Sequence, residues 1–232
     1  MLQEILNKLK KAGDPKIAAS SGKFFKEPVN LYGLKYADTK SILKEYLPLI
    51  SKMEKKDVFA LYDALLADNH LESGSIAAEF AYHIRNKFEK SDFQVFDKWV
   101  KEYITNWTNC DVLCNHSVNA LIEMYPELMP DIKRWSKSKN RWVKCASAVT
   151  FILSAHQGHF LDDVFEIAET LLTDPDDMVQ KGYGWALKAA GEFDPKRVFD
   201  FLTKRVDKMP RTAYRYAIEK LPTDMRKDAM AL

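Results

Sequence analysis

Helical stretches separated by short polar breaks recur along this chain, and their rhythm is the feature that most limits its possible folds. Apolar residues follow helical spacing in nearly every segment, and no alternation of apolar and polar residues persists to indicate a β-strand. From about residue 56, equivalent positions recur roughly every 35 residues, which is typical of paired-helix repeats. We expect helices over residues 56–67, 71–88, 92–104, 109–124, 127–137, 140–156, 160–172, 176–190, 195–206 and 210–220.

This pattern allows two architectures, a compact helical bundle or an all-α solenoid of HEAT or armadillo-like antiparallel helix pairs. The regular period favours the solenoid, right-handed and with a concave face. The second helix of each pair is the more apolar, so we expect second helices to form the inner, concave layer. The chain is predicted to be a single domain over residues 1–232, with N-terminal helices within 1–52 and regular pairs from about 56.

The N-terminal part is less regular than the repeats. We expect helices over residues 1–12 and 15–25, then a loop over 27–34 that contains Pro28, Asn30 and Gly33. Asp38 is expected to cap a third helix that runs to about Ile50.

Composition excludes several classes of protein. The chain is 47% hydrophobic and 29% charged, as is typical of a soluble globular protein rather than a disordered one. Only three cysteines are present, without the spacing of a disulfide framework, which indicates reduced thiols and a cytoplasmic location. There is no signal-peptide pattern, and no apolar run approaches the ~18 residues that span a bilayer.

The formal net charge of +2 does not by itself indicate a nucleic-acid partner, but the charge is unevenly distributed. One basic stretch between Met129 and Ala146 has Asp131 as its only acid. Such a stretch is either a solvated helix face or a surface that faces phosphate groups. Its cations are Lys133, Arg134, Lys137, Lys139, Arg141 and Lys144.

Two aromatic positions also allow two interpretations. Trp107 and Asp111 are four residues apart, so they lie on one helix face, either as a core indole with a helix-capping acid or as a site for a cation. Gly184 costs about 1 kcal/mol relative to alanine inside a helix, so a neighbouring helix or a ligand should approach it closely. Trp185 follows directly and should lie on the inner layer.

The sequence contains no clear motif for a metal site or a nucleotide site. The only clusters are Cys110-x3-Cys114-x-His116 and His156-x2-His159, and neither has the spacing of a structural zinc site. No local motif supports a nucleophilic cysteine. From this spacing we predict no metal, and because the chain has neither a P-loop nor a GxGxxG motif we predict no cofactor.

Several segments together resemble the DNA alkylation repair proteins of the AlkD type, which are HEAT-like repeat DNA glycosylases. The most specific is VQKGYGWALKAAGEFDP at 179–195, followed by NWTNCD at 106–111. Further matches are KFFKEPVNLYGLKYADTKSILKEY at 23–46, LESGSIAAEFA at 71–81 and RWVKCA at 141–146. The resemblance therefore extends over most of the chain.

The resemblance implies a role for particular residues. Asp111 matches the family's catalytic carboxylate, and Trp107 and Trp185 match the aromatic residues of its open cleft. Phe24 falls where active members can carry a tyrosine, and Cys145 falls where they carry a phosphate-contacting arginine. The residues predicted to bind DNA are Phe24, Lys137, Lys139, Arg141, Lys144, Lys181 and Lys188.

These roles predict a monomeric DNA glycosylase that hydrolyses the N-glycosidic bond of cationic N3- or N7-alkylated purines, such as 3-methyladenine and 7-methylguanine, in double-stranded DNA. Alkylation at a ring nitrogen makes the base cationic and a good leaving group, and aromatic faces with a carboxylate can stabilise that charge. Two alternatives remain. One is a non-catalytic HEAT-repeat protein that binds damaged or branched DNA. The other is a protein–protein scaffold, which would have both indoles in its core.

Overall fold

The computed structural model describes residues 1–232 as a chain of helices with no β-strand. Three short 3-10 turns (85–87, 90–92 and 126–128) and one π-helical segment (113–118) complete the regular structure. None of the helices combines the length and apolar character needed to span a bilayer. The α-helices are α1 (Leu2–Ala12), α2 (Pro15–Gly22), α3 (Tyr36–Ile50), α4 (Lys55–Ala67), α5 (Leu71–His83), α6 (Phe93–Glu102), α7 (Trp107–Val112), α8 (Asn119–Met124), α9 (Met129–Trp135), α10 (Arg141–Val149), α11 (Ile152–His156), α12 (Leu161–Thr170), α13 (Asp177–Phe193), α14 (Pro195–Thr203), α15 (Arg211–Ala217) and α16 (Thr223–Ala231).

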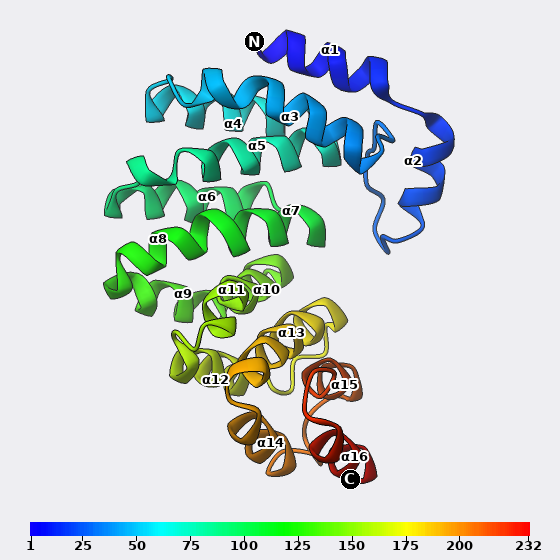
Figure 1. Cartoon of the computed structure of the whole chain (residues 1–232), viewed down its shortest axis with the longest axis vertical. Coiled ribbons are helices and arrows are strands. Elements are labelled where there is room, and N and C mark those ends of the chain that lie inside the picture. The colour runs from blue at the N-terminus through cyan, green and yellow to red at the C-terminus, as the bar shows by residue number, and fades with distance from the viewer.

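The helices form an α-solenoid, which confirms the predicted fold class. Figure 1 shows the helix pairs stacked along an arc from α1 to α16. Helices α5, α7, α10, α13 and α15 pack successively against one another as the inner layer, and α4, α6, α9, α12 and α14 pack outside them. The inner helices begin at Leu71, Trp107, Arg141, Asp177 and Arg211, and these starts are 36, 34, 36 and 34 residues apart.

Several predicted helix ends were wrong for local reasons. The third helix begins at Tyr36 with Lys35 at its N-cap, so Asp38 lies in the first turn and does not cap it. Helix α7 begins at Trp107, two residues earlier than expected, because the Asn106 side chain accepts a hydrogen bond of 2.9 Å from the backbone of Asn109. Asp111 is therefore inside a helix and caps nothing.

Other helix boundaries differ because the backbone turns at places where the helical spacing of apolar residues continues. The predicted helix 15–25 ends at Gly22, and the predicted 71–88 helix ends at His83 before a 3-10 turn. The predicted 140–156 helix is divided into α10 and α11. Helix α16 was not predicted, since most of its side chains are exposed and it buries only Ala229.

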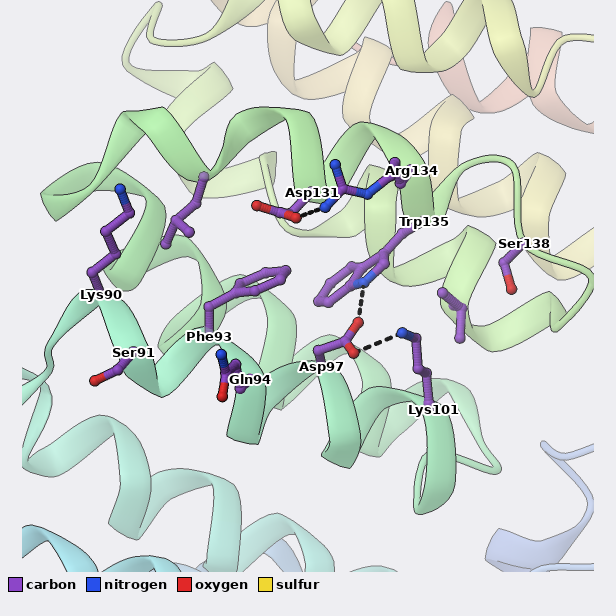
Figure 2. Close-up of a pocket in the computed structure, with 12 residues that line it drawn as sticks. Lys90, Ser91, Phe93, Gln94, Asp97, Lys101, Asp131, Arg134, Trp135 and Ser138 are labelled. Atoms are coloured by element: carbon purple, nitrogen blue, oxygen red, sulfur yellow. Dashed lines mark hydrogen bonds and ion pairs between the residues drawn. The ribbon is translucent and has the colours of Figure 1, made fainter.

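The outer layer is held together by contacts that repeat with the same period. The indole Nε1 of Trp99 donates to Asp63 at 2.7 Å, and the indole of Trp135 donates to Asp97 at 2.7 Å. Asp97 also accepts a hydrogen bond of 2.6 Å from Lys101, as Figure 2 shows for the hollow between α6 and α9. The Trp135 and Asp97 side chains in this outer hollow are therefore already paired, and they serve repeat packing.

The segment of residues 24–34, which we call the strap, connects α2 to α3 across the ends of the inner helices. Its turn depends on Gly33, whose φ of +84° would bring a Cβ to within 2.2 Å of the Asp14 carbonyl oxygen. Glu72 at the start of α5 accepts backbone hydrogen bonds from Tyr32, Gly33 and Leu34. The end of the strap is thus fixed to the inner layer by hydrogen bonds from its main chain to the Glu72 side chain.

Candidate functional site

A cavity of about 460 Å³ lies on the inner layer, between α7, α10, α13, α15 and the first part of the strap. Its volume is in the ~300–1,000 Å³ range of small-ligand sites. It brings together residues separated by up to 192 positions in the sequence. The lining residues are Phe24, Lys26, Glu27, Trp107, Asp111, Cys145, Val149, Met178, Lys181, Gly182, Trp185, Lys188 and Tyr216.

The two indoles line this cavity and are half-buried, so neither belongs to the fully buried core. Trp107 is the first residue of α7 and stacks on Phe25 of the strap, with ring centroids 5.3 Å apart and planes inclined by 18°. Trp185 comes from the middle of α13. The expectation of the scaffold alternative, that both indoles are enclosed in the core, does not match these positions.

Asp111 is one turn after Trp107 on α7 and also lines the cavity. Its carboxylate makes no hydrogen bond or ion pair with any other residue. Burial raises the pKa of Asp111 to about 7, because nothing nearby compensates for the lost hydration of the charged form. A half-buried carboxylate without a partner is costly, and carboxylates with strongly raised pKa values cluster at functional sites.

Another part of the cavity wall is made by a close contact between α10 and α13. Cys145 on α10 is almost completely buried, and its Sγ lies 3.7 Å from the Met178 carbonyl oxygen. A Cβ on Gly182 would lie 3.0 Å from that sulfur, so the absence of a side chain at position 182 lets α10 and α13 pack closely. A hydrogen bond with the Cys110 thiol, together with burial, raises the pKa of Cys145 well above its usual range, so this thiol is neutral.

Gly184 has the role of a close helix contact. A Cβ there would lie 2.8 Å from both the Ala213 carbonyl oxygen and Cβ of Tyr216. Of the two interpretations of Gly184, the structure shows the neighbouring helix, α15. Tyr216, which the sequence did not indicate, enters the cavity through this contact.

Four of the predicted DNA-binding cations lie near the cavity and are paired with acids. Arg141 contacts Glu27 of the strap and, at 3.0 Å, Asp176 before α13. Lys144 is paired with Asp174. The remaining two pairs are Lys181 with Asp177, at 3.2 Å, and Lys188 with Glu219, also at 3.2 Å.

The other predicted DNA-binding residues are more exposed. Lys137 and Lys139 are in the turn between α9 and α10 and form no ion pair. Phe24 is 79% exposed at the cavity rim. Lys133 and Arg134, also part of the basic stretch, pair instead with acids of the outer layer, Lys133 with Asp163 at 2.8 Å and Arg134 with Asp131.

Possible metal ligands do not gather at this cavity or elsewhere. No group of three or more His, Cys, Asp or Glu side chains is placed to hold a metal ion. The cavity instead offers two indoles, a phenol ring, an unpartnered carboxylate and paired cations.

The fold and the cavity define a class of helical-repeat proteins with an aromatic and acidic site on the inner layer. A sequence model described as "DNA alkylation repair enzyme" matches residues 5–221, so the chain belongs to this family. A search among curated proteins found no match.

One solved structure has the same fold along nearly its whole length. It is described as a "Predicted DNA alkylation repair enzyme from Enterococcus faecalis". It superposes with a TM-score of 0.81 and covers 91% of this chain and 97% of its own, at 16% sequence identity. At that identity the similarity concerns the fold alone.

Proposed function

We propose that this protein is a DNA glycosylase that removes cationic N3- or N7-alkylated purines, such as 3-methyladenine and 7-methylguanine, from double-stranded DNA by hydrolysing the N-glycosidic bond. One observation carries the proposal: the unpartnered carboxylate of Asp111 shares a cavity with the indoles of Trp107 and Trp185. Membership of the DNA alkylation repair enzyme family supports DNA as the partner.

The chemistry of the reaction matches these groups. An alkylated ring nitrogen places positive charge on the base, which then leaves readily as the bond to C1′ breaks. The sugar gains positive charge as this bond lengthens, and a nearby carboxylate stabilises that charge or orients the attacking water. Aromatic faces attract a cationic nucleotide by their negative quadrupole potential. Asp111 would supply the carboxylate, and Trp107 and Trp185 the aromatic faces.

The low polarity around Asp111 strengthens its interaction with developing charge. A carboxylate in water is screened, whereas one that is largely desolvated interacts more strongly with a cation at the same distance. A cationic nucleotide would in turn favour the ionised carboxylate. The geometry therefore suits a substrate that brings its own positive charge.

The test is release of 7-methylguanine from methylated duplex DNA by the purified protein. We expect release by the wild-type protein and its loss in Asp111→Asn, with DNA binding retained. Release at the rate of spontaneous depurination, with Asp111→Asn behaving as wild type, would overturn the proposal.

A second function is favoured by one observation, the buried and neutral Cys145 where the resemblance implies a phosphate-contacting arginine. A neutral thiol cannot replace that arginine's contact with the DNA backbone beside the cavity. The loss of this contact favours a relative that binds damaged or branched DNA without cleaving a bond. Salt-dependent DNA binding without base release would select this function.

A further inference from the structure

The charges around the cavity are nearly balanced, which bears on where the protein can hold a DNA backbone. Five cations are near it, and each contacts at least one carboxylate. Lys26, for example, contacts Asp177 at 2.6 Å. The five cations are Lys26, Arg141, Lys144, Lys181 and Lys188, and the acids are Glu27, Asp174, Asp176, Asp177 and Glu219.

Such a balance suits the proposed function, on which this inference rests. A free cation beside the cavity would repel a positively charged nucleotide, and its pairing with an acid removes most of that repulsion. The same pairing lowers the capacity of these cations to attract phosphate groups. Phosphate contacts should then come from unpaired cations farther along the inner layer.

Helix α15 provides such cations and is held next to the cavity. It packs closely against α13 because Gly184 has no side chain, and Tyr216 of α15 lines the cavity wall. Lys188 of α13 lies 5.7 Å from the centre of the Tyr216 ring and pairs with Glu219 just after α15. Figure 1 shows α15 beside α13 at the C-terminal part of the arc.

Two arginines on α15 are exposed and free of acidic partners. Arg211 and Arg215 are four residues apart, so they lie on one helix face, ~5–6 Å from each other at Cβ. The opposite side of α15 is buried through Ala213, Tyr214 and Ala217. Neither guanidinium forms a hydrogen bond or ion pair, and the preceding Lys208 is also exposed and unpaired.

We propose that Arg211 and Arg215 of α15 are a phosphate-binding pair that holds the backbone of duplex DNA on the C-terminal side of the cavity. Guanidinium groups suit this contact because they stay charged and can donate two parallel hydrogen bonds to phosphate oxygens. The paired cations nearer the cavity do not repel the positively charged base, while the unpaired arginines of α15 attract the DNA backbone.

The test compares the wild-type protein with the double variant Arg211→Gln/Arg215→Gln. Binding to a short, undamaged, fluorescently labelled duplex is measured by anisotropy between about 50 and 200 mM salt. We expect the slope of log K against log[salt] to become shallower by about 1.8, since each phosphate contact contributes about 0.9. The Kd at ~0.1 M salt should rise at least tenfold.

A matched control changes the same number of charges elsewhere. Arg226 and Lys227 on α16 are exposed and unpaired, and α16 packs against α14 of the outer layer. We expect Arg226→Gln/Lys227→Gln to keep the wild-type slope. An unchanged slope in the α15 variant, or an equal change in the α16 variant, would overturn the inference.

The outcome is separable from that of the proposed function. If the protein binds DNA through the α15 pair but releases no base, this inference stands and the proposed glycosylase activity is overturned. A protein that releases 7-methylguanine and binds DNA with an unchanged slope in the α15 variant would do the reverse. Circular dichroism of each variant establishes that loss of binding is not loss of fold.

Discussion

Asp111 is the residue on which the proposed chemistry depends, and its environment is unfavourable for an ionised group. It is half-buried, has no hydrogen-bond partner, and burial raises its pKa to about 7. The chain thus keeps a carboxylate that lowers stability when ionised, a pattern typical of functional sites.

The raised pKa of Asp111 predicts how activity depends on pH. Only the ionised carboxylate can stabilise developing positive charge, so kcat/KM for base release should rise with pH and reach half its maximum near pH 7. Rates from pH 5.5 to 8.5 on methylated duplex, corrected for spontaneous depurination, measure this. A flat profile across this interval would exclude Asp111 as the group that must be ionised.

The same residue predicts a gain of stability on mutation. The pKa of Asp111 is about 7 in the folded protein and ~3.9 in an unfolded chain, so the folded state binds the proton more tightly. As pH rises from about 4 through 7, the free energy of unfolding of the wild type therefore falls relative to that of Asp111→Asn. This difference reaches its full size above pH 7. We expect Asp111→Asn to be more stable at pH 8 by roughly 2 kcal/mol, and less so at pH 5. Urea unfolding at both values measures the difference, and a variant less stable than wild type at pH 8 would contradict it.

The sequence indicated part of this site and could not indicate the rest. Trp107 and Asp111 share a cavity with Trp185, as their helical spacing and the family resemblance led us to expect, while their roles stay predictions. Arg141 was predicted to bind DNA, but the sequence did not indicate its partner Glu27, which is 114 residues away. A contact over such a separation depends on the tertiary fold, which local patterns of charge do not specify.

At the scale of elements, the contact between α13 and α15 decides the shape of the cavity. Gly184 allows it, and Tyr216 reaches the cavity wall as a result. The helical period predicted both helices, and the glycine predicted a close approach. The sequence could not predict whether a helix or a ligand approaches Gly184, because either one requires that the position has no side chain.

This contact can be tested by adding one methyl group. Gly184→Ala places Cβ 2.8 Å from the Ala213 carbonyl oxygen, so the two helices must separate, and we expect a loss of about 1–3 kcal/mol in the free energy of unfolding. Gly191→Ala, in the same helix, meets no atom closer than 3.4 Å and should be neutral or up to ~1 kcal/mol stabilising. Denaturant unfolding of both variants measures the difference, and equal effects would exclude close packing as the reason for Gly184.

For the whole molecule, the repeat period predicted the solenoid, because each pair must bury its apolar face against the next pair. The strap could not be predicted in this way, since it is a loop outside the repeats. It links distant parts of the arc: Phe25 stacks on Trp107 of α7, Lys26 contacts Asp177 of α13, and residues 32–34 bond to Glu72 of α5. The first part of the strap therefore depends on ion pairs that a polyanion can disturb.

The pair between Glu27 and Arg141 predicts competition between the strap and DNA. The Glu27 carboxylate contacts Nη1 of the Arg141 guanidinium, whereas Asp176 contacts Nε and Nη2, so a phosphate group must displace Glu27 to reach Nη1. Glu27→Gln should strengthen binding to undamaged duplex by about 3- to 10-fold at low salt, which corresponds to ~0.7–1.4 kcal/mol. Glu45→Gln is the matched control, because Glu45 forms a comparable ion pair with Lys8 between α1 and α3, away from the cavity. Anisotropy titrations measure both affinities, and weaker binding by Glu27→Gln would show that the strap helps DNA binding by holding Arg141 in place rather than by competing for it.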